Sequence, residues 1–577
     1  MRQLFTLGDK IGHYLGSMSQ PRTSLHDRRD WAAHGFTGET SDLIAEGSLP
    51  KAWAKRWAAR PNAPILAEAD GRGQVARWIT AGQLDALSTT AARQFHVAGL
   101  RPGNRVVMSC APSVDLIVAH VGALRLGAIV VPVNPAYSAT EVARVIDVAR
   151  PTLALADDPS RMVSTTGQSF VRVAMLSELA PADDGSKLAE LDTMSADDPA
   201  MLMFTSGTTG APKGVVLSHG NILSSAEALR IAWQWTATDR LVLALPLFHM
   251  HGLGVGVHGT LLAGASAVLV QPFDVDSVLD TVREQQATLL FGVPTMWVRF
   301  AASPRVHELA ALRLCVSGSA PLATETWNAL SENGGQRILE RYGMTETVMN
   351  ISNPHDGERR AGSVGLALPG VEVRLLGPSS RDESFEAFEA IESIESIESA
   401  REATTPHELL DEPGEIILRG PNVLRSYWER PDATTEAFTE DGWFRTGDLG
   451  QFDNDGYLRI VGRSKELIIS GGFNVYPREV EETLARHRAV REAAVVGKAH
   501  REWGETVVGF VVLEPGFLQH NSLQKDTNTT PDEAILDELF AFAAEHLAKY
   551  KRPRELHIRA ELPRNALGKI IRSELLP

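Results

Sequence analysis

The residues best suited to chemistry lie in one short loop at residues 205–214, which reads TSGTTGAPKG. Apolar runs flank it at residues 201–204 and 215–217, so the pattern predicts a turn between two strands. Glycines let backbone N–H groups close on an anion, hydroxyl groups add donors, and Lys213 places a cation at the end of the loop. The motif is not a P-loop, because neither Ser nor Thr follows Lys213 and only two residues separate it from Gly210. A flexible turn is the alternative, but the length and order of the pattern favour a cradle for a triphosphate.

Further motifs follow this loop along the chain. They are YGMTE at residues 342–346, TGD at residues 446–448, a glycine and an arginine at Gly462 and Arg463, and PRNALGK ending at Lys569. Each motif alone is weak, because an isolated Glu, Tyr or Lys is usually a helix cap, a core residue or a solvated charge. Their joint occurrence in this order makes coincidence implausible.

Together with the loop at residues 205–214, these motifs resemble the signatures of the adenylate-forming superfamily of acyl-CoA synthetases, luciferases and peptide-synthetase adenylation domains. The segments PLFHMHG, FGVPTMWVR and ERYGMTETVMNISNPHDGERRAGSVGLALPGVEVRLL resemble malonyl-CoA synthetases in particular. The resemblance covers about residues 43–577. It implies an acid–thiol ligase that uses ATP, Mg²⁺ and CoA, forms an acyl-adenylate and then an acyl-CoA thioester, with malonate or methylmalonate as the acid.

The resemblance also assigns roles in adenylation, in which a carboxylate attacks the α-phosphorus of ATP and two anions must meet. Lys213 and Lys569 would neutralise charge, with Lys569 bridging the substrate carboxylate and the α-phosphate. Glu346 would anchor Mg²⁺, Tyr342 would stack on adenine, and Asp448 would accept the ribose hydroxyls. The implied ATP- and AMP-binding residues are Thr205, Ser206, Gly207, Thr208, Thr209, Gly210, Lys213, Ser317, Gly318, Ser319, Ala320, Pro321, Arg341, Tyr342, Gly343, Met344, Thr345, Asp448 and Arg463.

Transfer of the acyl group to a thiol is the second half-reaction, and in the family the small C-terminal domain rotates between the two steps. The matching hinge position is Lys465. The matching loop for the pantetheine arm of CoA contains Ser470, Gly471 and Gly472. Glycines without a Cβ would leave room for a narrow tunnel, whereas the simpler interpretation is a turn.

The same resemblance places the acyl pocket at His249, Arg299 and Met344. Arg299 would pair bidentately with the distal carboxylate of malonate, and His249 and Met344 would line a small pocket. An exposed helix arginine or a structural ion pair is the alternative for Arg299. The sequence does not decide between malonate, methylmalonate and another short or medium-chain acid.

The composition excludes several classes of protein. The chain has 577 residues with 44% hydrophobic and 22% charged residues, and its net charge is −16. This charge argues against non-specific nucleic-acid binding, and no apolar run reaches the ~20 residues that a membrane-spanning helix needs. Cys110 and Cys315 lie in apolar segments, so we expect no disulfide framework and a reducing, cytoplasmic compartment. The expected partners are a small carboxylic acid, ATP and CoA, and the oligomeric state, monomer or homodimer, stays open.

Helical and strand patterns alternate along the chain. They predict an α/β fold, with a large N-terminal multi-layer body of mostly parallel sheets and a small mobile C-terminal α/β lid. The predicted domains are a poorly ordered extension at residues 1–42, the body at 43–462 with an acidic low-complexity insertion near 379–412, and the lid at 463–577. Short strands that end in Gly-, Ser- or Thr-rich turns are expected to share one ligand cleft. Strands are predicted at residues 105–109, 128–132, 152–156, 241–247, 267–270, 289–292, 312–316, 371–376, 415–418, 459–462, 493–496 and 507–513, and helices at 84–98, 114–126, 139–148, 219–233, 275–286, 477–486 and 532–549.

Two rival functions keep the nucleotide site but change its use. An adenylation enzyme could load the phosphopantetheine of a carrier protein, and it would then not require free CoA. An adenylate-binding regulatory protein would be non-enzymatic. Lys213, Glu346 and Lys569 argue against the second rival, since a binding protein does not need a triphosphate lysine and a metal carboxylate together.

Overall fold

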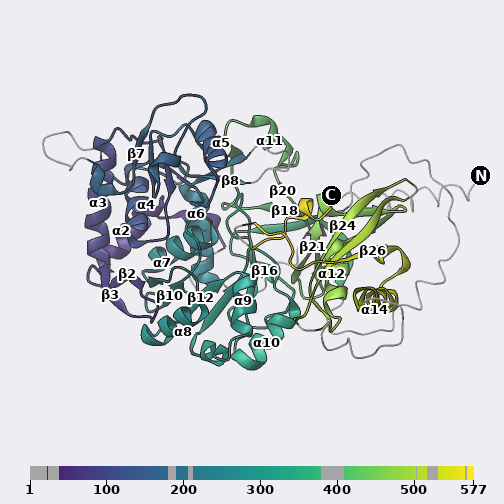
Figure 1. The fold of residues 1–577 in the computed structure, drawn as a ribbon. Coiled ribbons are helices and arrows are strands. Elements are labelled where there is room, and N and C mark those ends of the chain that lie inside the picture. The colour runs from purple at the N-terminus through teal and green to yellow at the C-terminus, as the bar shows by residue number, and fades with distance from the viewer. Residues whose placement is uncertain are drawn as a thin grey trace, which may run out of the picture. The chain divides into compact units, whose positions relative to one another are not determined.

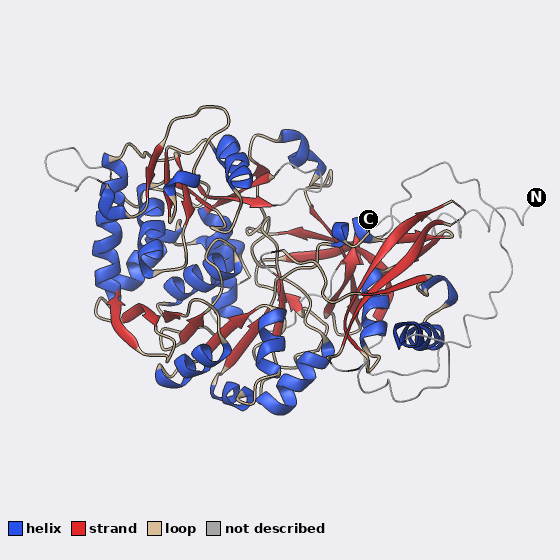
Figure 2. Cartoon of the chain, in the orientation of Figure 1, coloured by secondary structure: helices blue, strands red, loops and turns tan. Residues whose placement is uncertain are grey.

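The structure is a computed structural model that describes residues 22–23, 38–179, 190–205, 212–377, 409–501, 503–515, 517, 531–565 and 568–576. The chain divides into two compact units, which we describe separately. The larger unit comprises residues 26–372 and 418–444, and the smaller unit comprises residues 1–25, 373–417 and 445–577. Figure 1 labels the elements, and Figure 2 distinguishes helices from strands. The extension and the acidic insertion lie mostly outside the described residues, and the domain border at residues 462 and 463 stays a prediction.

The larger unit contains a seven-stranded sheet. Its strands, in spatial order, are β19 (Ser426–Tyr427), β9 (Lys213–Ser218), β8 (Pro199–Thr205), β5 (Ile129–Pro132), β4 (Arg105–Ser109), β6 (Leu153–Ala156) and β7 (Val171–Val173). The strands from β8 to β7 are parallel, whereas β8, β9 and β19 pair antiparallel. Val106 and Met108 of β4 belong to the main core, and Val107 belongs to the core on the other face, which α5 (Ala139–Ala149) covers. Both faces are therefore buried, as is usual for parallel strands.

The larger unit also contains a nine-stranded sheet. Its strands, in spatial order, are β16 (Leu366–Ala367), β15 (Ile351–Ser352), β14 (Leu339–Tyr342), β13 (Leu314–Ser317), β12 (Leu289–Gly292), β10 (Arg240–Leu243), β11 (Ser266–Leu269), β2 (Pro64–Ala69) and β3 (Val75–Thr80). Because β10, β12, β13 and β14 are parallel, their carboxyl ends lie along one edge of the sheet. The strand predicted at residues 241–247 ends earlier, at Leu243. Pro246 lacks the N–H that a central strand must donate, which accounts for the loop that follows.

Helices pack on both sheets of the larger unit. They are α2 (Leu49–Ala59), α3 (Ala81–Val97), α4 (Val114–Leu126), α6 (His219–Ala232), α7 (His258–Ala263), α8 (Val275–Glu284), α9 (Pro294–Ala301), α10 (Thr324–Gly334) and α11 (Pro431–Glu436), with the π-helix η5 (His251–Val257) and the 3-10 helices η2 (Thr40–Ile44), η3 (Pro159–Arg161), η4 (Leu176–Glu178) and η6 (Val306–Ala311). The helices α2, α3, α4, α6 and α7 contact one another and share the main core with both sheets. Ser218 caps the N-terminus of α6, because its hydroxyl accepts the Asn221 N–H at 3.1 Å.

The smaller unit is built around two further sheets. One contains β1 (Arg22–Thr23), β17 (Glu372–Leu376), β18 (Leu409–Arg419), β20 (Phe444–Asp453) and β21 (Leu458–Arg463), and the other contains β23 (Phe473–Val475), β22 (Ile468–Ser470), β25 (Gly504–Leu513), β24 (Val490–His500) and β26 (Glu555–Ile558). The second sheet is antiparallel except for the parallel pair of β25 and β26. Its core includes Val480 of α12 (Pro477–Ala485) and Leu539 of α14 (Pro531–His546). The short helices η7 (Ser464–Glu466), η8 (Lys549–Lys551) and η9 (Arg572–Glu574) complete this unit. Within the residues that the structure describes, no helix combines the length and apolar character needed to cross a membrane.

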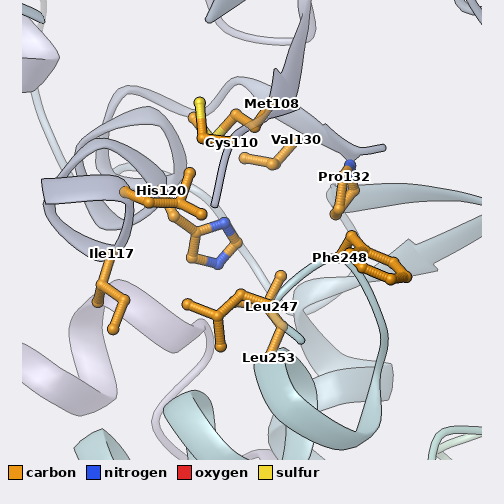
Figure 3. Close-up of a pocket in the computed structure, with 10 residues that line it drawn as sticks. Met108, Cys110, Ile117, His120, Val130, Pro132, Leu247, Phe248 and Leu253 are labelled. Carbon is orange, nitrogen blue, oxygen red and sulfur yellow. The ribbon is translucent and has the colours of Figure 1, made fainter. Parts of the chain in front are cut away.

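Three buried histidines lie together in the core of the larger unit. The Nε2 atoms of His120 and His258 are 2.7 Å apart, and their rings are stacked. His120 also lines a small, mostly apolar cavity of about 10 Å³ beside Cys110, shown in Figure 3, which has room for one water at most. Burial lowers the pKa of His120 to about 3 and that of His219 to about 4. The pKa of His258 is lowered in the same way, so the cluster is neutral at physiological pH.

We expect acid to destabilise the larger unit through these histidines. An unfolded histidine has a pKa of about 6.5, so the stabilisation is complete above that pH and is lost as the pH falls toward the folded values, at about 1.4 kcal/mol per pH unit for each group. His120→Gln removes one titrating ring. Between neutral pH and about pH 5, the melting temperature of this variant should therefore fall less than that of the wild-type protein. His557→Gln, at an exposed position in the smaller unit, should keep the wild-type pH dependence. Equal pH dependence in all three proteins would contradict this account.

Candidate active site

The loop predicted to cradle a triphosphate connects β8 with β9. The two strands form an antiparallel hairpin in which Thr205 pairs with Lys213, so both ends of the loop lie side by side. The predicted phosphate-binding residues between them, Ser206, Gly207, Thr208, Thr209 and Gly210, lie outside the described residues. Their assignment stays a prediction.

Tyr427 connects the lysine of this loop with the predicted metal carboxylate. The Lys213 Nζ atom lies 5.5 Å from the centre of the Tyr427 ring. The Tyr427 hydroxyl donates a 3.2 Å hydrogen bond to Glu346 Oε1. Tyr427 reaches this position because it pairs with Val215 of β9. Tyr427 and Glu346 are each only 8% exposed, and burial together with the carboxylate raises the pKa of the tyrosine. The structure thus brings together Lys213 and Glu346, which the sequence could only assign separately.

The loop that carries Glu346 is held by the segment that precedes Tyr427. The Leu424 N–H donates to the Glu346 carbonyl at 2.8 Å. The side-chain amide of Asn422, which is buried, donates to the Thr347 and Met349 carbonyls at 2.7 and 2.9 Å. One segment therefore fixes both the backbone and the carboxylate of this loop.

Glu346 fits the chemistry of a magnesium ion that accompanies a nucleotide. In the described part of the chain, no three His, Cys, Asp or Glu side chains gather as a metal site. A nucleotide-bound Mg²⁺ needs fewer protein ligands, because one or two carboxylates join phosphate oxygens and water in its coordination shell. A single hydrogen-bonded carboxylate is the donor that such an ion requires.

The predicted adenine side of the site lies on two neighbouring strand ends. In the parallel pair of β13 and β14, Ser317 is in register with Glu340, which puts Gly318 beside Arg341. A Cβ atom at Gly318 would lie 2.3 Å from Arg341 Cζ, so this close approach requires glycine. Burial lowers the pKa of Arg341 to about 9. The predicted residues on these two strand ends are Ser317, Gly318, Ser319, Ala320, Pro321, Arg341, Tyr342, Gly343, Met344 and Thr345.

His249 and His251 follow the end of a third parallel strand, β10. The His251 N–H donates to His249 Nδ1 at 3.3 Å, and His251 Nδ1 lies 3.3 Å from Ser319 Oγ. Desolvation and the charge of Arg341 lower the pKa of His249 to about 4, and the same two causes act on His251. Both rings are therefore neutral near physiological pH, and His249 shares one cluster with Arg341.

Arg299 lies on an exposed face of α9. Its guanidinium carbon is 4.7 Å from the centre of the Phe273 ring. The role of Arg299 in binding a distal carboxylate stays a prediction.

In the smaller unit, three predicted site residues lie close together. Asp448 and Arg463 pair across β20 and β21, and Arg463 Nε is 3.0 Å from Asp448 Oδ1. Lys569 is half-buried, and desolvation and then the charge of Arg463 lower its pKa, while Asp448 and Glu466 oppose the shift. The backbone N–H of Lys569 donates to Asn565 Oδ1 at 3.0 Å. The predicted ribose-binding acid and the predicted adenylation lysine therefore belong to one electrostatic cluster.

The residues predicted as the hinge and the CoA loop follow β21 along the chain. Lys465 lies in η7, immediately after β21. Ser470 pairs with Phe473 across the hairpin of β22 and β23, and Gly471 and Gly472 form its turn with φ values of 60° and 84°. Two consecutive positive φ values are typical of a tight hairpin turn, so the turn itself requires these glycines. Their role in a CoA tunnel stays a prediction.

The sequence offered no prediction for Tyr427 or Asn422. Tyr427 stands in a short aromatic pair, SYW, which is compatible with an edge strand, but a two-residue strand does not reveal its partner. Asn422 follows Gly420 and Pro421 and is most simply interpreted as part of a turn. The contacts of Tyr427 and Asn422 with the Glu346 loop were therefore found only in the structure.

Comparisons with known proteins agree over most of the chain. The family model described as AMP-binding enzyme matches residues 53–428, and the one described as AMP-binding enzyme C-terminal domain matches residues 479–569. Malonate–CoA ligase of Arabidopsis thaliana is 32% identical over 514 residues, which are 84% of this chain and 79% of that protein. Sulfoacetate–CoA ligase of Cupriavidus necator is 33% identical over 558 residues, 93% of this chain and 98% of that protein. The crystal structure of ATP-bound MatB from Rhodopseudomonas palustris superposes with a TM-score of 0.77 and 33% identity, covering 92% of this chain and 98% of that chain.

Tyr427→Phe tests whether the tyrosine hydroxyl positions Glu346. The ring and its contact with Lys213 remain, but the carboxylate loses a hydrogen bond, and a bond to a charged group contributes about 1.5–3 kcal/mol. We expect the affinity for Mg²⁺ and ATP, measured by titration calorimetry, to fall about tenfold or more. Tyr457→Phe, at a tyrosine that is also 8% exposed, should leave it unchanged. Unchanged affinity in Tyr427→Phe would show that the hydroxyl is not needed.

Proposed function

The chain belongs to the AMP-binding enzyme family and is an acid–thiol ligase that forms an acyl-CoA, and from this premise we propose that its acid is malonate. ATP and CoA are its co-substrates, and Mg²⁺ accompanies ATP. The observation that supports malonate best is the similarity to the malonate–CoA ligase of Arabidopsis thaliana, which extends over 84% of this chain.

In the first step, an oxygen of the malonate carboxylate attacks the α-phosphorus of ATP. A new O–P bond forms while the bond to the bridging oxygen of pyrophosphate breaks, giving malonyl-AMP. The main obstacle is repulsion between anions, so the chain contributes fixed positive charge. Lys213 holds the triphosphate, Lys569 bridges the carboxylate and the α-phosphate, and Glu346 provides the carboxylate for Mg²⁺.

In the second step, the CoA thiol attacks the acyl carbon of malonyl-AMP. The C–S bond forms, the C–O bond to AMP breaks, and the thiol proton passes to solvent. Asp448 and Arg463 hold the ribose, while the turn of Ser470, Gly471 and Gly472 admits the pantetheine arm, with Lys465 as the hinge. The cytoplasm stays the proposed compartment, and methylmalonate stays within the proposed substrate range.

A second candidate acid is sulfoacetate, because the relative named for it matches 93% of this chain and 98% of its own length. Malonate and sulfoacetate are both short acids that carry a second anionic group. Loading of a carrier protein is the other candidate use of the adenylate, and a requirement for free CoA separates it from the ligase.

An AMP-release assay across a panel of acids tests the substrate. With Mg²⁺, ATP and CoA present, we expect kcat/KM to be highest for malonate or methylmalonate, lower for acetate, propionate and butyrate, and negligible for long-chain and aryl acids. Omitting CoA should stop turnover but leave acid-dependent exchange of pyrophosphate into ATP. A long-chain or aryl acid that outperforms malonate would reject the malonate proposal.

Lys569→Ala tests the division of labour between the two steps. The lysine stabilises charge only in adenylation, so malonyl-AMP formation should fall by about 10²-fold or more. Thioester formation from supplied malonyl-AMP and CoA should survive. Lys549→Ala, at an exposed position in the same unit, should affect neither step. If both steps fell equally in Lys569→Ala, the lysine would not have the proposed role.

A further inference from the structure

We propose that Arg572 is a positioning residue that fixes the segment of Lys569 to the hinge of the smaller unit and thereby sets the rate of adenylation. Its guanidinium joins two carboxylates, those of Glu466 in η7 and Glu481 in α12. None of these three charged residues belongs to the predicted site. Because Arg572 acts through Lys569, the inference rests on the proposed function.

The Arg572 side chain forms a fork between two elements. Its Nη2 atom donates to both oxygens of Glu481, at 2.7 and 3.0 Å, and its Nη1 atom lies 3.1 Å from Glu466 Oε2. The side chains are 23% exposed for Arg572, 15% for Glu481 and 30% for Glu466, so water screens this network only in part. A planar guanidinium holds two carboxylates at fixed angles, which an ammonium group does not do. The network therefore sets geometry as well as charge.

Glu481 makes the α12 end of this network rigid. Its Oε1 atom also accepts the N–H of Val495, on β24, at 2.8 Å. Desolvation raises the pKa of this carboxyl, and the charge of Arg572 opposes the shift. A buried carboxylate is costly unless it is paired and hydrogen-bonded, so Glu481 holds the guanidinium in one place.

Glu466 connects the network with the hinge. It follows Lys465, the predicted hinge residue, in the three-residue helix η7. Glu466 also acts on the adenylation lysine, because desolvation lowers the pKa of Lys569 and the charge of Glu466 is among those that oppose the shift. The same carboxylate is therefore next to the hinge in the sequence and near Lys569 in the structure.

Other contacts hold the segment of Lys569 against the neighbouring sheet. Arg564 and Ile570 form an antiparallel bridge. Ile570 and Leu575 pack with an apolar cluster from β24 and β25. These contacts fix the segment on the sheet, whereas Arg572, three residues after Lys569, contacts η7. Loss of the contact with η7 should therefore loosen the position of Lys569 relative to the hinge without releasing the segment.

Adenylation is the step that depends on this position. Lys569 must reach both the substrate carboxylate and the α-phosphate, and a displacement of about 1 Å at a catalytic group can cost about 10²-fold in rate. Thioester formation does not use Lys569 in the proposed mechanism. Loss of the contact between Arg572 and Glu466 should therefore slow the first step and spare the second.

A purely structural ion network is the alternative. A network that only stabilises the fold would, when broken, lower the melting temperature and affect both steps alike. A positioning network would, when broken, slow adenylation while the fold and thioester formation persist. The two half-reactions must therefore be measured separately, together with stability.

We suggest Glu466→Gln, which removes the hinge contact but leaves the pair of Arg572 and Glu481, and Arg572→Lys, which keeps the charge but loses the fork. Lys498→Met is the control, since Lys498 and Glu555 form an exposed pair elsewhere in the smaller unit. Acid-dependent exchange of pyrophosphate into ATP measures adenylation, and reaction of supplied acyl-AMP with CoA measures thioester formation.

We expect the kcat of adenylation to fall about tenfold or more in Glu466→Gln and in Arg572→Lys, with the KM for ATP within about threefold of wild type. Thioester formation should stay within about twofold, and the melting temperature within about 3 °C, because partly exposed ion pairs contribute little to stability. Lys498→Met should behave as wild type in both half-reactions. An equal loss in both half-reactions, or unchanged adenylation in the two variants, would overturn the inference.

A double-mutant cycle tests whether the two residues act through one contact. In the double variant of Glu466→Gln and Arg572→Lys, the second substitution should reduce adenylation by less than about twofold, because the contact is already broken. Losses that multiply would show that the two residues act independently and would also overturn the inference.

The choice of acid separates this inference from the proposed function. Every variant is assayed with the acid that the wild-type enzyme prefers and with the corresponding acyl-AMP. If that acid is not malonate but the variants lose adenylation alone, the malonate proposal fails and the role of Arg572 stands. If malonate is preferred and the variants adenylate it at the wild-type rate, only the inference fails. If Lys569→Ala slows both half-reactions equally, the proposed role of Lys569 fails and that of Arg572 fails with it.

Discussion

The hydrogen bond from a buried tyrosine hydroxyl to a carboxylate is the contact on which the predicted triphosphate side of the larger unit depends. Tyr427 belongs to a two-residue strand on β9, and Glu346 belongs to the loop after β14, so the bond joins the two sheets of this unit. The same ring contacts Lys213. Because a cation and a carboxylate must act on one triphosphate, their spacing matters more than the strength of either contact. Tyr427 sets that spacing.

Burial determines the electrostatics around Arg341. The chain carries a net charge of −16, yet its ligands are anions, so positive charge must be concentrated locally. Desolvation and the charge of Arg341 lower the pKa of His249 and His251, so both rings are neutral near physiological pH and the positive charge here belongs to Arg341.

Local sequence pattern was sufficient for many elements and insufficient for the contacts between them. β4 and α4 have the predicted bounds because continuous apolar runs end at turn-forming residues. The resemblance to the adenylate-forming superfamily identified the family, and the motif residues on β13 and β14 lie on adjacent strand ends. The bond between Tyr427 and Glu346 spans 81 residues and has no local signal. The sequence also did not reveal which arginines are buried. Arg299 and Arg341 both have apolar neighbours in the sequence, but Arg299 is exposed and Arg341 is buried.

The dependence of the Glu346 loop on Asn422, Leu424 and Tyr427 has a consequence for biosynthesis. A ribosome releases the chain from its N-terminus, so Lys213 and Glu346 emerge well before the segment that joins them. The nascent larger unit therefore carries an exposed, unpaired edge on β9 until residue 427 leaves the exit tunnel. During that interval the Glu346 loop lacks the hydrogen bonds from Asn422, Leu424 and Tyr427, and the edge of β9 is open to pairing with another chain.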